Sequence, residues 1–203
     1  MKSLSEIETT VKRASRAAGF SWGIAEEVGK SIRLLELFGL PGVKNLNQYY
    51  EDKKVKKFES LNLIREKNLS SSNYFCPIIL GVSFLDQIKK MEVLRKIQFN
   101  NISYPIIFLS FLSRSSEIIG KKIYIKFDNY EILLNLNVNI YSNFFNQEFP
   151  MVSNDIEVKF IENKDNFTEL EWQNLYKMSE NTFVEESESL KQSGAGAGLT
   201  DND

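Results

Sequence analysis

The sequence predicts an α+β fold, because helical and strand-like patterns occupy separate parts of the chain. Apolar residues recur at spacings of three and four over residues 3–39, which indicates a hairpin of two amphipathic helices. From residue 102 onwards apolar and polar residues alternate, which is typical of antiparallel strands. A last helical pattern begins at Thr168. We therefore expect an N-terminal helical hairpin and a C-terminal helix packed on a mostly antiparallel sheet.

The ends of the two N-terminal helices carry recognisable capping residues. Ser5 and Glu8 fit a capping box at the start of the first helix, and Gly19 can end that helix in a left-handed conformation. Ser21 fits the N-cap of the second helix, and Gly39 fits its C-terminal end. The apolar stripes that we expect to pack into the core comprise Leu4, Ile7, Val11, Ala14 and Ala18 in the first helix and Ile24, Val28, Ile32 and Leu35 in the second.

The middle of the chain carries weaker signals. Residues 45–73 are polar with scattered apolar side chains, and they predict a partly helical connector. Tyr74 and Phe75 predict a short strand that Pro77 breaks, after which the segment continues as a helix. The most apolar stretch, residues 106–112, is far shorter than the roughly 20 residues that cross a bilayer as a helix. We interpret it as a buried strand.

Alternation is clearest in three later segments. Residues 122–127 and 130–136 predict a β-hairpin, which Asp128 and Asn129 can turn. Residues 156–160 alternate in the same way, so we expect an antiparallel sheet of at least four strands.

The C-terminal part combines a helix with a change in composition. Thr168 and Glu171 fit a second capping box, and an amphipathic pattern follows them. Beyond residue 192 the chain is rich in glycine, alanine and acidic residues. A length of 203 residues lies near the top of the common single-domain range. We expect one α+β domain over residues 1–192 and a flexible acidic tail over residues 193–203.

The charge balance and the cysteine content limit which partners and which cellular compartment we expect. The 25 basic and 27 acidic side chains are interspersed and give a net charge of −2, so we expect no nucleic-acid partner. The N-terminus lacks a secretory signal pattern, and the single cysteine cannot form an internal disulfide. We therefore expect a cytoplasmic protein without membrane contact.

The chain contains no histidine, which excludes several mechanisms. Ser-His-Asp and Cys-His catalysis cannot be built, and neither can zinc sites of the His/Cys type. Walker, dinucleotide-binding and EF-hand motifs are also missing from the sequence. We expect no cofactor and no bound metal, and carboxylates alone would suit Mg²⁺ or Ca²⁺.

One face of the second predicted helix carries a candidate binding site. Trp22, Glu26, Gly29 and Arg33 lie at offsets of four, three and four, so they share a face beside the apolar stripe. A glycine inside a helix costs roughly 1 kcal/mol relative to alanine, which suggests that something approaches the backbone there. Either another segment of the same chain packs into this notch and pairs with Arg33, or a ligand or partner occupies it.

Two further features have alternative interpretations. Cys76 is either a buried small hydrophobic residue or a thiolate activated by a basic side chain or a helix N-terminus. The tail is either a disordered terminus or a docking element, in which Leu199 fills an apolar pocket while Asp201 and Asp203 face basic groups.

Three segments together resemble a proteobacterial family known only as a domain of unknown function. They are residues 15–42, with a Trp-Gly and a Glu-Glu pair, residues 76–86, and the terminal Gly-Ala-Gly-Ala-Gly-Leu-Thr-Asp-Asn-Asp over residues 194–203. The resemblance implies a bacterial source but no activity, cofactor or catalytic residue.

These observations favour a non-catalytic accessory or binding protein of cytosolic metabolism. We expect it to contact another protein through the helical hairpin face or the C-terminal tail. The alternative is an enzyme without histidine, a hydrolase or lyase in which Glu26, Glu27 or Asp86 acts with Arg33, with or without Mg²⁺.

Overall fold

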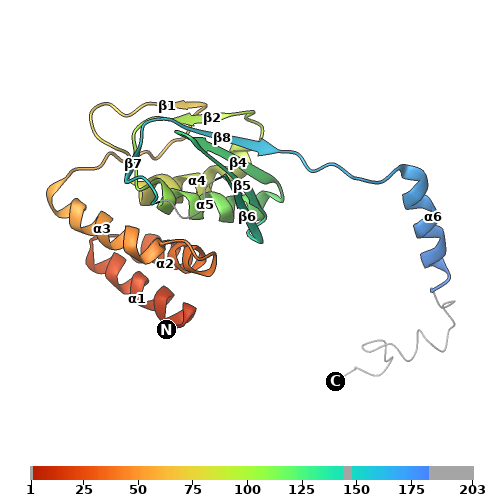
Figure 1. Cartoon of the computed structure of the whole chain (residues 1–203), viewed down its shortest axis with the longest axis horizontal. Coiled ribbons are helices and arrows are strands. Elements are labelled where there is room, and N and C mark those ends of the chain that lie inside the picture. The colour runs from red at the N-terminus through yellow and green to blue at the C-terminus, as the bar shows by residue number, and fades with distance from the viewer. Residues whose placement is uncertain (1, 144–147, 183–203) are drawn as a thin grey trace, which may run out of the picture. The chain divides into compact units, whose positions relative to one another are not determined.

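A computed structural model describes residues 2–143 and 148–182 (Figure 1). The chain divides into two compact units, residues 1–163 and 164–203, which are described separately below. The first unit contains helices α1 (Leu4–Ala17), α2 (Trp22–Leu37), α3 (Gly42–Val55), α4 (Pro77–Met91) and α5 (Pro105–Ile119), and strands β1 (Lys67–Asn68), β2 (Ile97–Phe99), β3 (Ile102–Ser103), β4 (Lys122–Phe127), β5 (Tyr130–Asn135), β6 (Asn139–Ser142), β7 (Val152–Ser153) and β8 (Ile156–Ile161). The α+β class is confirmed.

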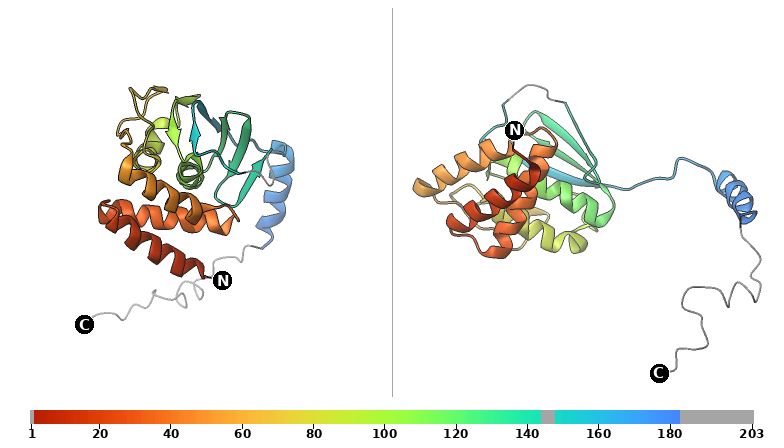
Figure 2. Two further views of the ribbon diagram at one scale, coloured as in Figure 1. Left: turned by 60° about the vertical axis from the view of Figure 1, so that its left-hand side comes forward. Right: turned by 90° about the horizontal axis from the view of Figure 1, so that it is seen from below.

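The first unit is built in three layers, which Figures 1 and 2 show from different sides. A six-stranded sheet forms the first layer, α4 and α5 the second, and the helices α1, α2 and α3 the third. One apolar cluster, with Phe99, Phe108 and Ile125, lies between the sheet and the middle layer. A second cluster, with Ile32 and Phe111, lies between the middle layer and the N-terminal helices. The two central helices are therefore covered on both sides.

The hairpin of α1 and α2 forms as expected, with one change at its start. The N-cap of α1 is Ser3, whose hydroxyl accepts a hydrogen bond of 3.1 Å from the backbone N–H of Glu6. The predicted capping box at Ser5 and Glu8 is therefore wrong, because the helix begins one residue before Ser5. Ser21 caps α2 as predicted, accepting from the N–H of Ile24.

The predicted apolar stripes are only partly buried. Val11, Val28 and Ile32 are buried, whereas Ile7 and Ile24 are half-buried. Further along α1, Ser15 is buried and the predicted Ala14 is exposed. Burial of Ser15 costs no hydrogen bond, because its hydroxyl donates to the Val11 carbonyl.

The stretch interpreted as a buried strand, residues 106–112, is part of helix α5, so that interpretation is wrong. The stretch is apolar on every side because α5 lies between the sheet and the N-terminal helices, and a helix covered on both faces loses its amphipathic pattern. Gly81 of α4 lies against the ring of Phe111, so these two helices approach closely. Within the described ranges, every helix is too short or too polar to cross a lipid bilayer.

The connector and the segment after it agree with the sequence-based prediction of a partly helical connector, a short extended segment and a helix. Residues 42–55 form α3, so the first part of the polar stretch predicted as a partly helical connector is a regular helix and the rest is not. Phe75 makes isolated bridges with Glu59 and Ile102, which agrees with a short extended segment. Pro77 occupies the first turn of α4, where its missing N–H costs nothing.

The large sheet has the strand order β1-β2-β8-β4-β5-β6, and all of its pairs are antiparallel except β1 with β2. The predicted β-hairpin is present as β4 and β5, with Phe127 paired to Tyr130 across the turn. The strand predicted at residues 156–160 is β8, which pairs with β4 and β2. A short second sheet joins β3 and β7.

The second unit contains α6 (Glu169–Glu180). The capping box predicted at its start is present, since the Thr168 N–H donates to the Glu171 carboxylate at 2.6 Å and the Glu171 N–H donates to the Thr168 hydroxyl at 3.3 Å. The packing of this helix on the sheet stays a prediction. The domain boundary predicted between residues 192 and 193 lies outside the described residues.

Candidate binding surface of the helical hairpin

Trp22, the first residue of α2, is 57% exposed although it is the largest apolar side chain of the hairpin. The guanidinium of Arg16, from the end of α1, lies 5.7 Å from the centre of the indole ring. This distance is within the range of a cation–π contact, which holds the ring without burying it.

Gly29 is buried beneath α1. A Cβ atom at this position would lie 2.9 Å from the carbonyl oxygen of Glu8 and 3.4 Å from the Cβ of Lys12. Since real Cβ atoms hardly ever approach an oxygen so closely, α1 and α2 can cross here only because residue 29 has no side chain. The notch in α2 is thus filled by another segment of the same chain, the first of the two interpretations that the sequence leaves open.

Arg33 lies one turn further along α2 and pairs with Glu8, with 3.3 Å between its nitrogen and the carboxylate oxygen. The arginine side chain is 49% exposed and the Glu8 side chain is 30% exposed. Because both groups remain in contact with water, their pairing contributes about 0–1 kcal/mol to folding. The guanidinium keeps donors that a partner can reach.

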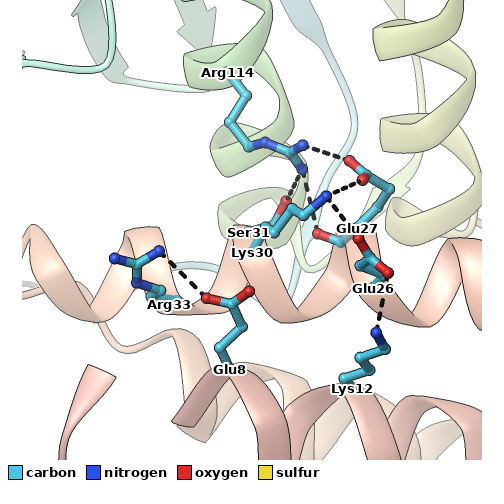
Figure 3. Close-up of polar contacts among 8 residues, drawn as sticks. All are labelled: Glu8, Lys12, Glu26, Glu27, Lys30, Ser31, Arg33 and Arg114. Atoms are coloured by element: carbon cyan, nitrogen blue, oxygen red, sulfur yellow. Dashed lines mark hydrogen bonds and ion pairs between the residues drawn. The ribbon is translucent and has the colours of Figure 1, made fainter. Parts of the chain in front are cut away.

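Glu26 lies between two lysines, as Figure 3 shows. Its carboxylate oxygens are each 3.0 Å from an ammonium nitrogen, one from Lys12 of α1 and the other from Lys30 of α2. The hydrogen bond and charge of Lys12, together with those of Lys30, lower the pKa of Glu26 to about 2. The group is therefore ionised at every physiological pH.

Glu27 connects the hairpin to the middle layer. Its carboxylate makes a short ion pair with Arg114 of α5, and the same guanidinium donates to the Ser31 hydroxyl at 3.2 Å (Figure 3). Burial alone would raise the pKa of Glu27, but the hydrogen bonds and charges of Arg114 and Lys30 outweigh it and lower this pKa. Sequence reasoning missed Arg114, because its partner lies 87 positions away and the preceding residues 106–112 were interpreted as a strand.

An apolar groove of about 840 Å³, here called the hairpin groove, lies between α1 and the junction of α2 and α3. Leu4, Ile7 and Val11 of α1 form one wall, and Val43 at the start of α3 faces them. The polar groups of its lining include Lys2, Glu6, Thr10 and Glu36. Leu4 and Ile7 of the predicted α1 stripe are thus only half-buried and remain accessible in the described part of the chain, whereas Val11 is buried.

Cys76 is buried at the N-terminus of α4, where its sulfur accepts a hydrogen bond from the Ile79 N–H and lies 3.0 Å from the Tyr49 hydroxyl. Burial raises the pKa of this thiol, although these hydrogen bonds act in the opposite direction. The environment is that of a buried helix cap rather than an activated thiolate.

Of the remaining predicted residues, only Asp86 belongs to the described part of the chain, and it lies apart from this surface. Leu199, Asp201 and Asp203 lie outside the described residues. Asp86 is an exposed residue of α4 and lines a different groove from the hairpin groove. Over residues 2–143 and 148–182, no three acidic or thiol side chains gather as they would around a metal ion.

The fold and this surface define a layered α+β protein whose N-terminal helices carry paired charges and an accessible apolar groove. Residues 2–75 match the model of a family described as a protein of unknown function, DUF3726. The match spans the hairpin, α3 and β1, and it confirms the resemblance to a domain of unknown function for this part of the chain. No curated protein and no solved structure matches the chain.

Proposed function

We propose that this protein is a non-catalytic binding protein that receives an amphipathic helix of a partner protein in the hairpin groove. The observation that carries the proposal is the accessible apolar wall of α1. Leu4 and Ile7 lie one turn apart and are only half-buried, so they form an apolar ridge, with the buried Val11 at its base, that a helix of the partner can pack against. Accessible apolar patches of this kind are typical of protein interaction sites.

The charges around the groove favour a partner helix with both basic and acidic residues. Lys2 and Glu6 pair with each other at 2.7 Å but remain 74% and 48% exposed, and Glu36 adds a further carboxylate to the lining. The Val43 N–H donates to the Glu36 carboxylate at 2.8 Å, which holds the junction of α2 and α3 in place before any partner arrives. A groove whose walls are already ordered loses less conformational entropy on binding.

The arrangement of the carboxylates supports binding rather than catalysis. Glu26 and Glu27 are engaged with lysine and arginine, and their lowered pKa values keep them ionised. A general acid needs a proton at neutral pH, which these groups do not carry. Asp86 lines a groove to which neither glutamate contributes, so the three carboxylates do not converge.

Other parts of the proposal concern location and the tail. We propose that the protein acts in the cytoplasm of a bacterial cell as an accessory to metabolism. The tail residues Leu199, Asp201 and Asp203 would supply a second contact, with an apolar anchor and carboxylates that suit a basic surface.

The test uses two valines of the same helix. Val43→Glu places a charge inside the hairpin groove, whereas Val55→Glu places the same charge at a position that is 83% exposed. Both variants should melt like the wild type. In pull-downs from native cell extract, Val43→Glu should lose the partner because burying a charge in an apolar contact costs several kcal/mol, and Val55→Glu should retain it.

A photo-reactive residue at position 43 should crosslink to the same partner, and mass spectrometry should locate the crosslink in a helical segment. Retention of the partner by Val43→Glu, or crosslinking only from position 55, would contradict the proposal.

A further inference from the structure

A second groove, here called the α4 groove, has a volume of about 480 Å³. One face of α4 forms its longer wall, and Ile24 of α2 together with Asn62 and Leu63 of the preceding loop forms the other. Its volume lies within the range of small-molecule sites in proteins.

Ser83 of α4 lines this groove with a hydroxyl that has no partner. The residue is only 9% exposed, yet its side chain makes no hydrogen bond with the rest of the described chain. Each of the other buried serines there uses its hydroxyl, for example Ser115 with the Phe111 carbonyl and Ser31 with Arg114. Because no fully buried side-chain oxygen of the described residues lacks a partner, the Ser83 oxygen must be reachable from the groove, where a ligand can bond to it.

Opposite charges lie beside this hydroxyl. Asp86 and Lys90 are exposed, line the same groove and are one helical turn apart on α4. No ion pair joins them to each other or to another described residue. The groove therefore presents one free carboxylate and one free ammonium group in a fixed order along the helix.

The wall opposite α4 is ordered by a single side chain. The Gln87 amide nitrogen donates to the Asn62 carbonyl at 2.9 Å and to the Ser83 carbonyl at 2.8 Å, and its oxygen accepts from the Ile64 N–H at 3.2 Å. These hydrogen bonds fix the loop against the helix, so the groove is formed in the free protein.

The other end of the groove is apolar. Ile79 and Val82 lie one turn before Ser83 and Asp86, and Ile24 lies across from them. Along α4 the order is thus an apolar end, then a hydroxyl with a carboxylate, then an ammonium group.

We propose that the α4 groove binds a small zwitterion with a branched apolar side chain, that is, an aliphatic α-amino acid. The ligand's ammonium group is bound by Asp86 and by the Ser83 hydroxyl as acceptor. Its carboxylate is bound by Lys90, and its side chain lies against Ile24, Ile79 and Val82. The charges of ligand and groove cancel in pairs, which favours a zwitterion over a simple acid or amine.

The test measures binding of L-leucine to the full chain by calorimetry. Leucine should bind with saturable heat, while leucinamide, which lacks the carboxylate, and 4-methylpentanoate, which lacks the ammonium group, should each bind at least about tenfold more weakly, since a hydrogen bond to a charged group is worth roughly that factor. Absence of leucine binding at millimolar concentration, or equal binding of the three compounds, would overturn the proposal.

Single substitutions assign the contacts. Ser83→Ala, Asp86→Asn and Lys90→Met should each weaken leucine binding about tenfold or more. Lys89→Met is the matched control, because Lys89 is an exposed neighbour on α4 outside the groove lining, and it should bind leucine like the wild type. Ser83→Ala should also leave the melting temperature unchanged. Equal loss of binding in Lys89→Met and Lys90→Met would show nonspecific charge attraction and refute the site.

Discussion

The ion pair between Arg114 and Glu27 should be the strongest polar link between the hairpin and the middle layer. Its side chains are 18% and 26% exposed, the lowest combined exposure among the ion pairs of the described residues. Arg114→Met removes the guanidinium, keeps much of the apolar stem, and leaves the Glu27 carboxylate in a largely buried position. The Ser31 hydroxyl and the Glu27 carbonyl lose their donor at the same time.

The expected cost follows from the burial of the pair. Removing one member of a fully buried ion pair costs about 3–5 kcal/mol, and an exposed pair is worth about 0–1 kcal/mol. Since about a fifth of each side chain is exposed, we expect Arg114→Met to lower the free energy of unfolding by about 2–3 kcal/mol. In a domain of this size that corresponds to a fall in melting temperature of about 4–12 °C.

Urea unfolding followed by circular dichroism measures this difference, and Arg33→Met is the matched control. Arg33 also joins two helices through a glutamate, but it is 49% exposed, so its replacement should cost no more than about 1 kcal/mol. Equal losses in the two variants, or a loss below about 1 kcal/mol for Arg114→Met, would refute the argument from burial.

Three further predictions concern the hairpin. Val28→Asp should cost several kcal/mol in urea unfolding, because Val28 is completely buried and an unpaired charge there has no partner; unchanged stability would mean that the helical phase of α2 is wrong. Gly29→Ala should cost about 1–3 kcal/mol by pushing on the Glu8 carbonyl, whereas Gly23→Ala, with open space around its Cβ, should stabilise by up to about 1 kcal/mol; the same sign for both in thermal melts would contradict the close approach of α1. Finally, the lowered pKa of Glu26 means that its ion pairs stabilise the fold above the ordinary pKa near 4.5 and lose this effect as the pH falls towards 2. Unfolding measured from pH 6 to pH 2 should therefore show a smaller loss of stability in Glu26→Gln than in the wild type, and identical pH profiles would argue against the pairing.

The candidate site was only partly predictable from the sequence. The shared face of Trp22, Glu26, Gly29 and Arg33 follows from helical spacing, and so does the need for a close approach at the glycine. It is α1 that packs against this glycine, and this depends on the crossing of two helices, which no local sequence pattern encodes. Arg114 joins the network from a distant helix, and only packing brings it to Glu27.

The α4 groove shows the same limit. Ser83, Asp86 and Lys90 share one face of a helix, and that face is readable from their spacing. Among the buried serines of the described residues, only the Ser83 hydroxyl makes no hydrogen bond with the chain, and this becomes a property of a groove only once Ile24 and the loop at residues 62–64 are in position.

By itself the sequence determined those features that arise from interactions within a few residues. The caps at Ser21 and Thr168 and the turn between β4 and β5 are examples, because each depends on a side chain or backbone conformation that acts on its immediate neighbours. Only the tertiary structure decided that residues 106–112 are a helix. An apolar run carries no period once both of its faces are buried, so the choice between strand and helix depends on the layers on either side of it.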